Sequence, residues 1–224
     1  AAFNAGESYT VWTATQAVTA GTVITLSNFT GGATASIGTL APVTVVGSTN
    51  RGVANSGEMV YAYLGSSATT PTAFLSAISN DSASSGSLAN TGLSYGTNAL
   101  ALPSSADAGA YVGTRTGAVS FDAYRTLVNN PANWATQDAS GDQSIDGTAP
   151  DVPFSTAAFS PALGQTGDIA FVGFNSDGGD NLAFVAFKDI AAGQVIRFTD
   201  NEWNGTGWTV SDVLSPRRSR ARVR

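Results

Sequence analysis

The sequence predicts an all-β fold, an antiparallel β-sandwich with one or two short helices. Runs of Val, Thr and other β-branched residues are separated by Gly and Asn clusters, a pattern that favours strands joined by turns. Hydrophobic residues make up 42% of the 224 positions, enough for a packed core, whereas charged residues make up only 12%. All-β single domains often reach about 200–250 residues, so the length allows one large domain or two small ones.

The segments expected to be strands combine alternation or short apolar runs with β-branched residues. In chain order they are 8–13, 22–27, 42–46, 57–64, 99–102, 168–174, 182–187 and 194–199. Residues 72–79 fit a short helix or a strand, because periodicity does not separate the two in so short a run. Residues 121–129 are the best helix candidate, with Ser120 as N-cap and Asn130-Pro131 as the stop. Long loops are expected at 80–92 and 137–166.

Two stretches near opposite ends of the chain resemble each other. The first repeat, residues 6–28, reads G-E-S-Y-T-V-W-T-A-T-Q-A-V-T-A-G-T-V-I-T-L-S-N, and the second repeat, residues 179–205, reads G-D-N-L-A-F-V-A-F-K-D-I-A-A-G-Q-V-I-R-F-T-D-N-E-W-N-G. Aligned on Gly21 and Gly193, each has an acid, an apolar strand, a turn and then Val-Ile. We expect two strand–turn–strand units whose glycine supplies an unusual backbone angle. Chance similarity of two low-complexity segments is the alternative.

The second repeat lies within G-D-I-A-F-V-G-F-N-S-D-G-G-D-N-L-A-F-V-A-F-K-D-I-A-A-G-Q-V-I-R-F-T-D-N-E-W-N-G, residues 167–205. This stretch resembles the opening of a β-sandwich module that occurs, often in tandem, in large secreted bacterial proteins. Some of those proteins also carry RTX calcium repeats or extracellular nuclease domains. In that family the opening is followed by segments similar to four segments of this chain: A-F-N-A-G-E-S-Y-T-V-W-T, V-T-A-G-T-V-I-T-L-S-N, a G-E-x-V-x-A-Y-x-G strand and P-A-N-W. The expected sandwich is immunoglobulin-like or lamin-tail-like.

The order of these segments differs from the family's order, because the opening comes last. A cut through a tandem array would give this order, and the resemblance therefore implies a circular permutation. We expect one domain over residues 1–208, in which the strands of 167–208 complete the sandwich of a body, 1–158, after a linker, 159–166. The alternative is a swap with a neighbouring copy. The Arg-rich residues 209–224 are expected to be a disordered tail.

The residue types that are missing narrow the chemistry. The chain has no Cys and no His. Disulfides, thiolate nucleophiles, Ser-His-Asp triads and imidazole metal sites are therefore excluded. A metal would have to be held by oxygen atoms, which indicates calcium or magnesium, and acid–base chemistry would fall mainly to carboxylates, with Tyr or Lys188 as lesser candidates.

The charge distribution argues against nucleic acid and anionic membranes as partners. Residues 1–216 carry all 16 acids and five of the ten bases, a net charge of −11, and the other five bases are arginines within 217–224. A body this acidic should repel nucleic acid and anionic membranes. The Arg tail is interpreted as a processing remnant or added sequence, with a nucleic-acid arm as the alternative. No apolar run is long enough to span a membrane, so no membrane insertion is expected.

Two acidic loops are candidate calcium sites. The first contains Asp138, Asp142 and Asp146 with Ser and Gly between them, and a solvated linker is its alternative interpretation. The second contains Asp177 and Asp180 between two predicted strands, where a hairpin turn is the more common use of such residues.

A third acidic segment, Thr199-Asp-Asn-Glu-Trp203, is the candidate catalytic site. On a strand, Asp200 and Glu202 would face the same side roughly 6–7 Å apart, a separation that suits glycoside hydrolysis. Glu7 and Glu58 are candidate partners, and Asp200 and Glu202 are also candidates to share a calcium ion with Glu7. Trp203 and Trp208 are candidate sugar-stacking residues. The alternative is that Asp200-Asn201 is a turn and Trp203 a core residue.

These observations predict a secreted, extracellular, calcium-stabilised β-sandwich module with an adhesive or scaffold role. The alternative is a glycoside hydrolase or carbohydrate-binding module that uses a carboxylate pair and surface tryptophans, so catalysis stays open. The expected partners are a polysaccharide or neighbouring modules of the same array.

Overall fold

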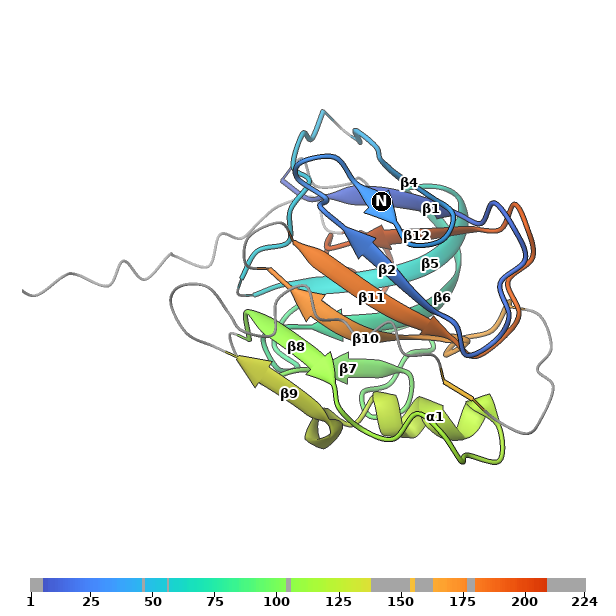
Figure 1. Ribbon diagram of the computed structural model, residues 1–224. Coiled ribbons are helices and arrows are strands. Elements are labelled where there is room, and N and C mark those ends of the chain that lie inside the picture. The colour runs from blue at the N-terminus through green and yellow to red at the C-terminus, as the bar shows by residue number, and fades with distance from the viewer. Residues whose placement is uncertain are drawn as a thin grey trace, which may run out of the picture.

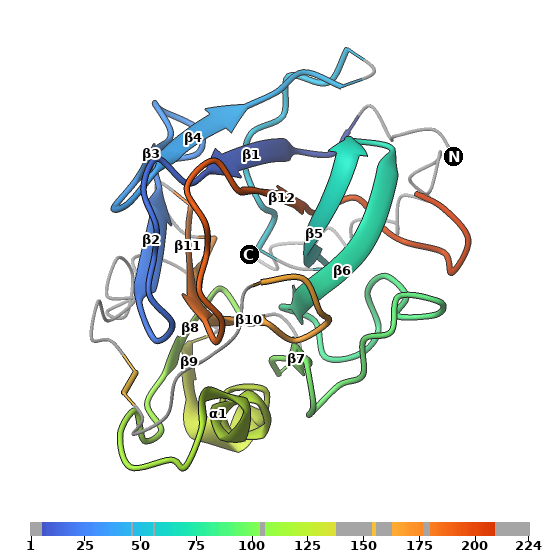
Figure 2. The same cartoon turned by 90° about the vertical axis from the view of Figure 1, so that its right-hand side faces the viewer.

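Two six-stranded sheets face each other across an apolar core (Figure 1, Figure 2). The computed structural model describes residues 6–45, 47–55, 57–103, 106–137, 154–155, 163–176 and 180–208. The all-β sandwich expected from the sequence is confirmed, and all strand pairs within the two sheets are antiparallel except one.

The first sheet has the strand order β4-β1-β12-β5-β6-β7. Its strands are β4 (Thr39–Pro42), β1 (Tyr9–Thr13), β12 (Val195–Thr199), β5 (Met59–Ser67), β6 (Thr70–Ser79) and β7 (Ala99–Ala101). β6 and β7 form the parallel pair. β5 and β6 form a long, curved hairpin whose register shifts at three places.

The second sheet has the strand order β3-β2-β11-β10-β8-β9. Its strands are β3 (Thr34–Ala35), β2 (Val23–Ser27), β11 (Asn181–Ala186), β10 (Ile169–Asn175), β8 (Ala108–Tyr111) and β9 (Trp134–Gln137). The helix α1 (Phe121–Val128) and a short 3-10 helix, Pro131–Asn133, connect β8 to β9. α1 buries Tyr124 and Val128.

The core between the sheets is apolar and rich in aromatic rings. Trp12 of β1 and Phe184 of β11 meet edge to face across the sandwich, with ring centroids 5.7 Å apart. Phe198 of β12 packs on Phe184 at 5.5 Å. Ring pairs in this distance range stabilise a core beyond the area that they bury.

A second buried cluster covers the outer face of the first sheet. It includes aromatic residues from β1, β5 and β6 together with Trp203 and Trp208, which follow β12. Trp208 packs on Tyr61 at 5.5 Å and on Trp203 at 5.3 Å. The segment after β12 therefore covers this face of the sheet.

The C-terminal strands lie inside both sheets. β12 pairs with β1 on one side and β5 on the other, and β11 lies between β2 and β10. Without β10, β11 and β12, the strands β1, β2, β5 and β8 would each lose a partner on an apolar sheet.

The two repeats lie side by side and antiparallel. Each is an arch that leaves one sheet and enters the other, since β1 and β12 belong to the first sheet and β2 and β11 to the second. The two repeats keep the same pairing register along their whole length. Tyr9 lies opposite Thr199, Val18 opposite Ile190 and Leu26 opposite Leu182. Figure 1 shows the two connections running together.

The two turns of the arches are equivalent. The Gly21 amide donates to the Ala186 carbonyl at 2.7 Å, and the Gly193 amide donates to the Ala14 carbonyl at 2.6 Å. Both glycines have positive φ, 90° and 82°. The unusual backbone angle predicted from the alignment is therefore present, and the similarity of the repeats corresponds to an approximate two-fold relationship between the arches.

Most predicted elements agree with the structure to within about two residues. Residues 72–79 belong to β6, so the choice between helix and strand is resolved as strand. The strand predicted at 42–46 is displaced, since β4 ends at Pro42 and the Val43 amide makes one more hydrogen bond to β1, to the Tyr9 carbonyl at 2.9 Å. Ser120 is the N-cap of α1, but its side chain makes no capping hydrogen bond.

Among the described residues, no helix is long and apolar enough to cross a membrane.

Candidate metal centre

Three carboxylates meet at one end of the first sheet. Glu7, Glu58 and Asp200 each offer a carboxylate oxygen, and these three atoms lie within 4.8 Å of one another. Glu7 and Asp200 are buried and Glu58 is half-buried. The three residues are far apart in the sequence, so the site is created by the fold.

Strand pairing explains why they meet. Glu7 lies two residues before β1, Glu58 directly precedes β5, and Asp200 directly follows β12. Because β12 runs antiparallel to both neighbours, its end lies beside the starts of β1 and β5. Asp200 also continues the alternation of Ile196 and Phe198, which face the core, so its side chain belongs to the inner face.

Hydrogen bonds hold the backbone around the three carboxylates. The Ser8 amide donates to Asp200 Oδ1 at 2.7 Å, and Thr199 Oγ1 donates to the Ser8 carbonyl at 3.0 Å. The Glu58 amide donates to Asn80 Oδ1 at 2.9 Å. Ser48 Oγ donates to the Glu7 carbonyl at 2.8 Å. The backbone beside each of the three carboxylates is therefore held by a neighbour from another segment.

The environment of Asp200 opposes its negative charge. Asp200 is 2% exposed, and burial, followed by the negative charge of Glu58, raises the pKa of Asp200 from 3.8 to about 8. The Ser8 amide and the Glu7 side chain lower the pKa, but by less. Ionising Asp200 beside the other two carboxylates therefore costs free energy, unless a bound cation compensates the negative charges.

This donor set suits a hard cation. Calcium takes 6–8 oxygen ligands, and carboxylates that bind through one or both oxygens are its usual protein ligands. Three carboxylates can supply three to six of these oxygens, and water would supply the rest. A bound divalent cation would stabilise the charged form of Asp200 and connect β1, β5 and β12.

The structure brings together three of the four carboxylates that were named for the candidate catalytic site. Asp200 lies with Glu7 and Glu58, whereas Glu202 is exposed. The expectation that Asp200 and Glu202 share a strand face is wrong, because β12 ends at Thr199 and the chain turns at Asn201. The signal available in the sequence was that Glu7 and Asp200 directly flank predicted strands, 8–13 and 194–199, and that Glu58 lies at the start of another, 57–64.

The remaining predicted site residues lie elsewhere. Trp203 and Trp208 are 9% and 1% exposed, so their rings offer almost no surface for a sugar. Asp180 is buried and its Oδ2 accepts from the Val53 amide at 3.1 Å, which ties the second sheet to the loop before β5. The candidate ligands in the two acidic loops that lie outside the described residues are Asp138, Asp142, Asp146 and Asp177.

The space beside Asp200 is a small recess. It is lined mainly by apolar side chains, among them Phe29, Val60 and Phe198. Its volume is about 10 Å³, which is far too small for a sugar ring.

No protein-family model, curated protein or solved structure matches this chain.

Proposed function

We propose that this protein is a secreted β-sandwich module with an adhesive or scaffold role, stabilised by calcium bound to Glu7, Glu58 and Asp200. The observation that carries the proposal is the meeting of three carboxylates that flank three strands far apart in the sequence. The resemblance of residues 167–205 to modules of secreted bacterial proteins supports the extracellular location and the structural role.

The position of the cluster favours a structural cation over a reacting centre. It joins the ends of three neighbouring strands, so an ion there would resist their separation during unfolding. An ion that binds only the folded state adds stability in proportion to the logarithm of its concentration above the dissociation constant. Calcium in the extracellular space would keep such a site filled.

A glycoside hydrolase is the second candidate, because an acid whose pKa lies near neutrality suits proton donation to a leaving group. The raised pKa of Asp200 is the observation in its favour. Against it, Asp200 is 2% exposed, Glu202 is outside the cluster, and Trp203 and Trp208 are buried. A substrate would have to displace core side chains to reach the acid.

Thermal unfolding of the whole chain, with calcium, with magnesium and after removal of divalent cations, tests the proposal. Calcium at about 100 times its dissociation constant should add about 2.7 kcal/mol, or roughly 5–10 °C for a domain of this size. Magnesium should have a smaller effect, because it prefers a rigid octahedral shell with several waters.

A panel of chromogenic glycosides, run beside the melts, separates the two candidates. Calcium-dependent melting without turnover supports the structural module. Turnover that disappears when Asp200 is replaced by Asn would instead favour the hydrolase, and equal melting with and without calcium would overturn the proposed site.

A further inference from the structure

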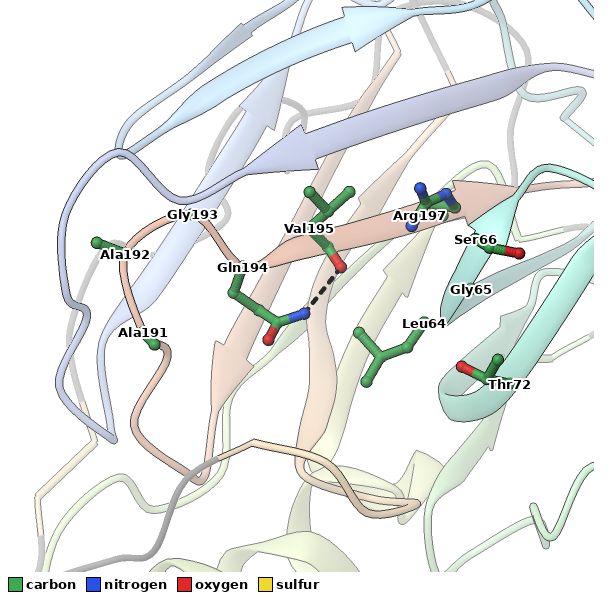
Figure 3. A pocket seen from close by; sticks show the side chains of 10 residues that line it. All are labelled: Leu64, Gly65, Ser66, Thr72, Ala191, Ala192, Gly193, Gln194, Val195 and Arg197. Atoms are coloured by element: carbon green, nitrogen blue, oxygen red, sulfur yellow. Dashed lines mark hydrogen bonds between the residues drawn. The ribbon is translucent and has the colours of Figure 1, made fainter.

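A groove lies between the β5–β6 hairpin and the start of β12, away from the three carboxylates (Figure 3). Its volume is about 590 Å³, which is within the range of small-molecule sites. The lining includes Leu64, Gly65, Ser66, Thr72, Gln194 and Arg197.

The groove exists because β5 separates from β12. The two strands pair only from Arg197 to Thr199 of β12, although β12 begins at Val195. Register shifts after Ala62 and on both sides of Gly65 bend the hairpin away from the sheet, as bulges do. The first residues of β12 therefore lack β5 as a neighbour on that side.

Polar groups line the opened gap. Ser66 and Thr72 contribute hydroxyl groups, and Gln194 contributes an amide. The Gln194 side chain donates to the carbonyl of Val195 at 3.2 Å, drawn as the dashed line in Figure 3. No aromatic side chain is among the lining residues, so the groove offers hydrogen bonds and not a stacking platform.

Arg197 brings a positive charge into this groove. The other cations in the described part of the chain have partners: Arg125 and Lys188 bind Asp122, Arg115 lies over the Tyr111 and Phe154 rings, and Arg51 donates to backbone carbonyls. Within that same part of the chain, Arg197 forms no ion pair, and its buried Nε has no hydrogen-bond partner. Its guanidinium interacts with the Tyr9 hydroxyl on β1, which helps to position it.

We propose that this groove binds a small hydroxy acid, such as a hexuronate, whose carboxylate pairs with Arg197. Arginine presents a planar fork of donors that matches a carboxylate. The hydroxyls of Ser66 and Thr72 and the amide of Gln194 bind the ligand's hydroxyl groups. Residues 1–216 carry more acidic than basic residues, and this net negative charge disfavours a polyanion. The proposed ligand therefore carries a single carboxylate.

NMR titration of the isotope-labelled whole chain tests this site with three probes. Sodium glucuronate should shift the resonances of Gly65, Ser66 and the Gln194 side-chain amide in a saturable manner. Glucose has the hydroxyls without the carboxylate, and acetate has the carboxylate without the hydroxyls. Each should bind about tenfold more weakly than glucuronate, because one set of contacts is lost.

Two variants make the test specific. Arg197→Gln should weaken glucuronate binding about tenfold or more, whereas Arg51→Gln removes the same charge elsewhere and should leave the affinity unchanged. Gln194→Ala tests the groove by a neutral substitution if Arg197→Gln does not fold. A disaccharide that ends in glucuronate distinguishes two natural ligands. Tighter binding than that of free glucuronate identifies the end of a glycan as the ligand, and weaker binding identifies the free acid.

Three results would overturn the proposal. They are the absence of saturable shifts with glucuronate, equal affinity of the wild-type chain and Arg197→Gln, and an equal loss of affinity in Arg51→Gln. This site does not depend on the calcium cluster, so its failure leaves the proposed function intact.

Discussion

The backbone amide of Ser8 donates a hydrogen bond to Oδ1 of Asp200 at 2.7 Å, although 192 positions separate the two residues. The contact joins the start of β1 to the end of β12 and fixes the most buried of the three clustered carboxylates. It also brings the two repeats together at their outer ends, so the proposed cation site and the pairing of the repeats share one structural origin.

Replacing Asp200 by Asn should abolish the calcium-dependent rise in melting temperature. Asn keeps an oxygen that can accept from the Ser8 amide, so the fold should persist while a charged ligand is lost. The calcium-induced shift, expected at roughly 5–10 °C in the wild-type chain, should fall to nearly zero. Calorimetric melts with and without calcium measure this.

Glu202→Gln is the matched control for Asp200→Asn. It removes the same charge two residues away, at an exposed position outside the cluster. Its calcium-induced shift should equal that of the wild-type chain. Loss of the shift in Glu202→Gln, with retention in Asp200→Asn, would contradict the assignment of the ligands.

The stability of the calcium-free protein should fall as the pH rises. In the unfolded chain Asp200 loses its proton near its ordinary pKa of 3.8, whereas burial and Glu58 hold the proton in the folded chain up to about pH 8. Between these values the folded state binds more protons than the unfolded state, so raising the pH favours unfolding.

Urea unfolding at several pH values between about 5 and about 8 measures this dependence, because the midpoint reports stability. Asp200→Asn should flatten the curve, since the amide does not titrate. Calcium should also oppose the fall, because the ion replaces the proton. A calcium-free midpoint that rises over this window would refute the environment assigned to Asp200.

The equivalent glycines of the two arches should respond differently to alanine. Both have positive φ, so Gly193→Ala, whose new methyl group meets nothing within 4 Å, should cost about 1–2 kcal/mol. At Gly21 the methyl group would overlap the Phe154 carbonyl and the Phe121 ring, so the cost should be about 2–5 kcal/mol. Urea unfolding of both variants compares the costs, and equal values would mean that Phe154 does not hold this turn.

Many strand positions could be predicted because the buried strands of this chain are also rich in apolar and β-branched residues. β10 and β11 are buried almost throughout, so their apolar runs identified them directly, whereas β12 showed the alternation of a strand with one face in the core. β8 has the sequence Ala-Gly-Ala-Tyr and β9 follows the 3-10 helix at once, so neither gave a clear signal. Their pairing with each other and with β10 determines these strands more than their own residue preferences do.

The candidate site was harder to predict than the strands, because carboxylate contacts depend on which strands are neighbours. The sequence marked Glu7, Glu58 and Asp200, but only the β1-β12-β5 order places them together. Treating Asp200 to Trp203 as strand also misplaced Glu202. The Trp203 and Trp208 rings were ambiguous, since a large aromatic side chain suits a core and a binding face equally well.

A reordered chain in which residues 159–208 precede residues 1–158 should fold to the same sandwich. Trp208 and Tyr9 belong to the same buried cluster on the first sheet, so the residues before Ser8 supply the length for the new junction. The sheets depend on pairing in space, and the new chain ends fall between β9 and β10 in the sequence, where a break costs less than one within a strand. Its melting temperature and calcium response should match those of the wild-type chain.

A chain opened between Ala62 and Tyr63 is the control for this rearrangement, because the break would lie inside β5, which pairs with β12 and β6. This control should unfold at a much lower temperature, since it interrupts ladder hydrogen bonds in the middle of the first sheet. If both rearranged chains fail to fold, the native order of the segments is required for folding and the predicted circular permutation loses its physical basis. If only the β5 break fails, the strands of 167–208 belong to the same folding unit as the body whichever of the two comes first.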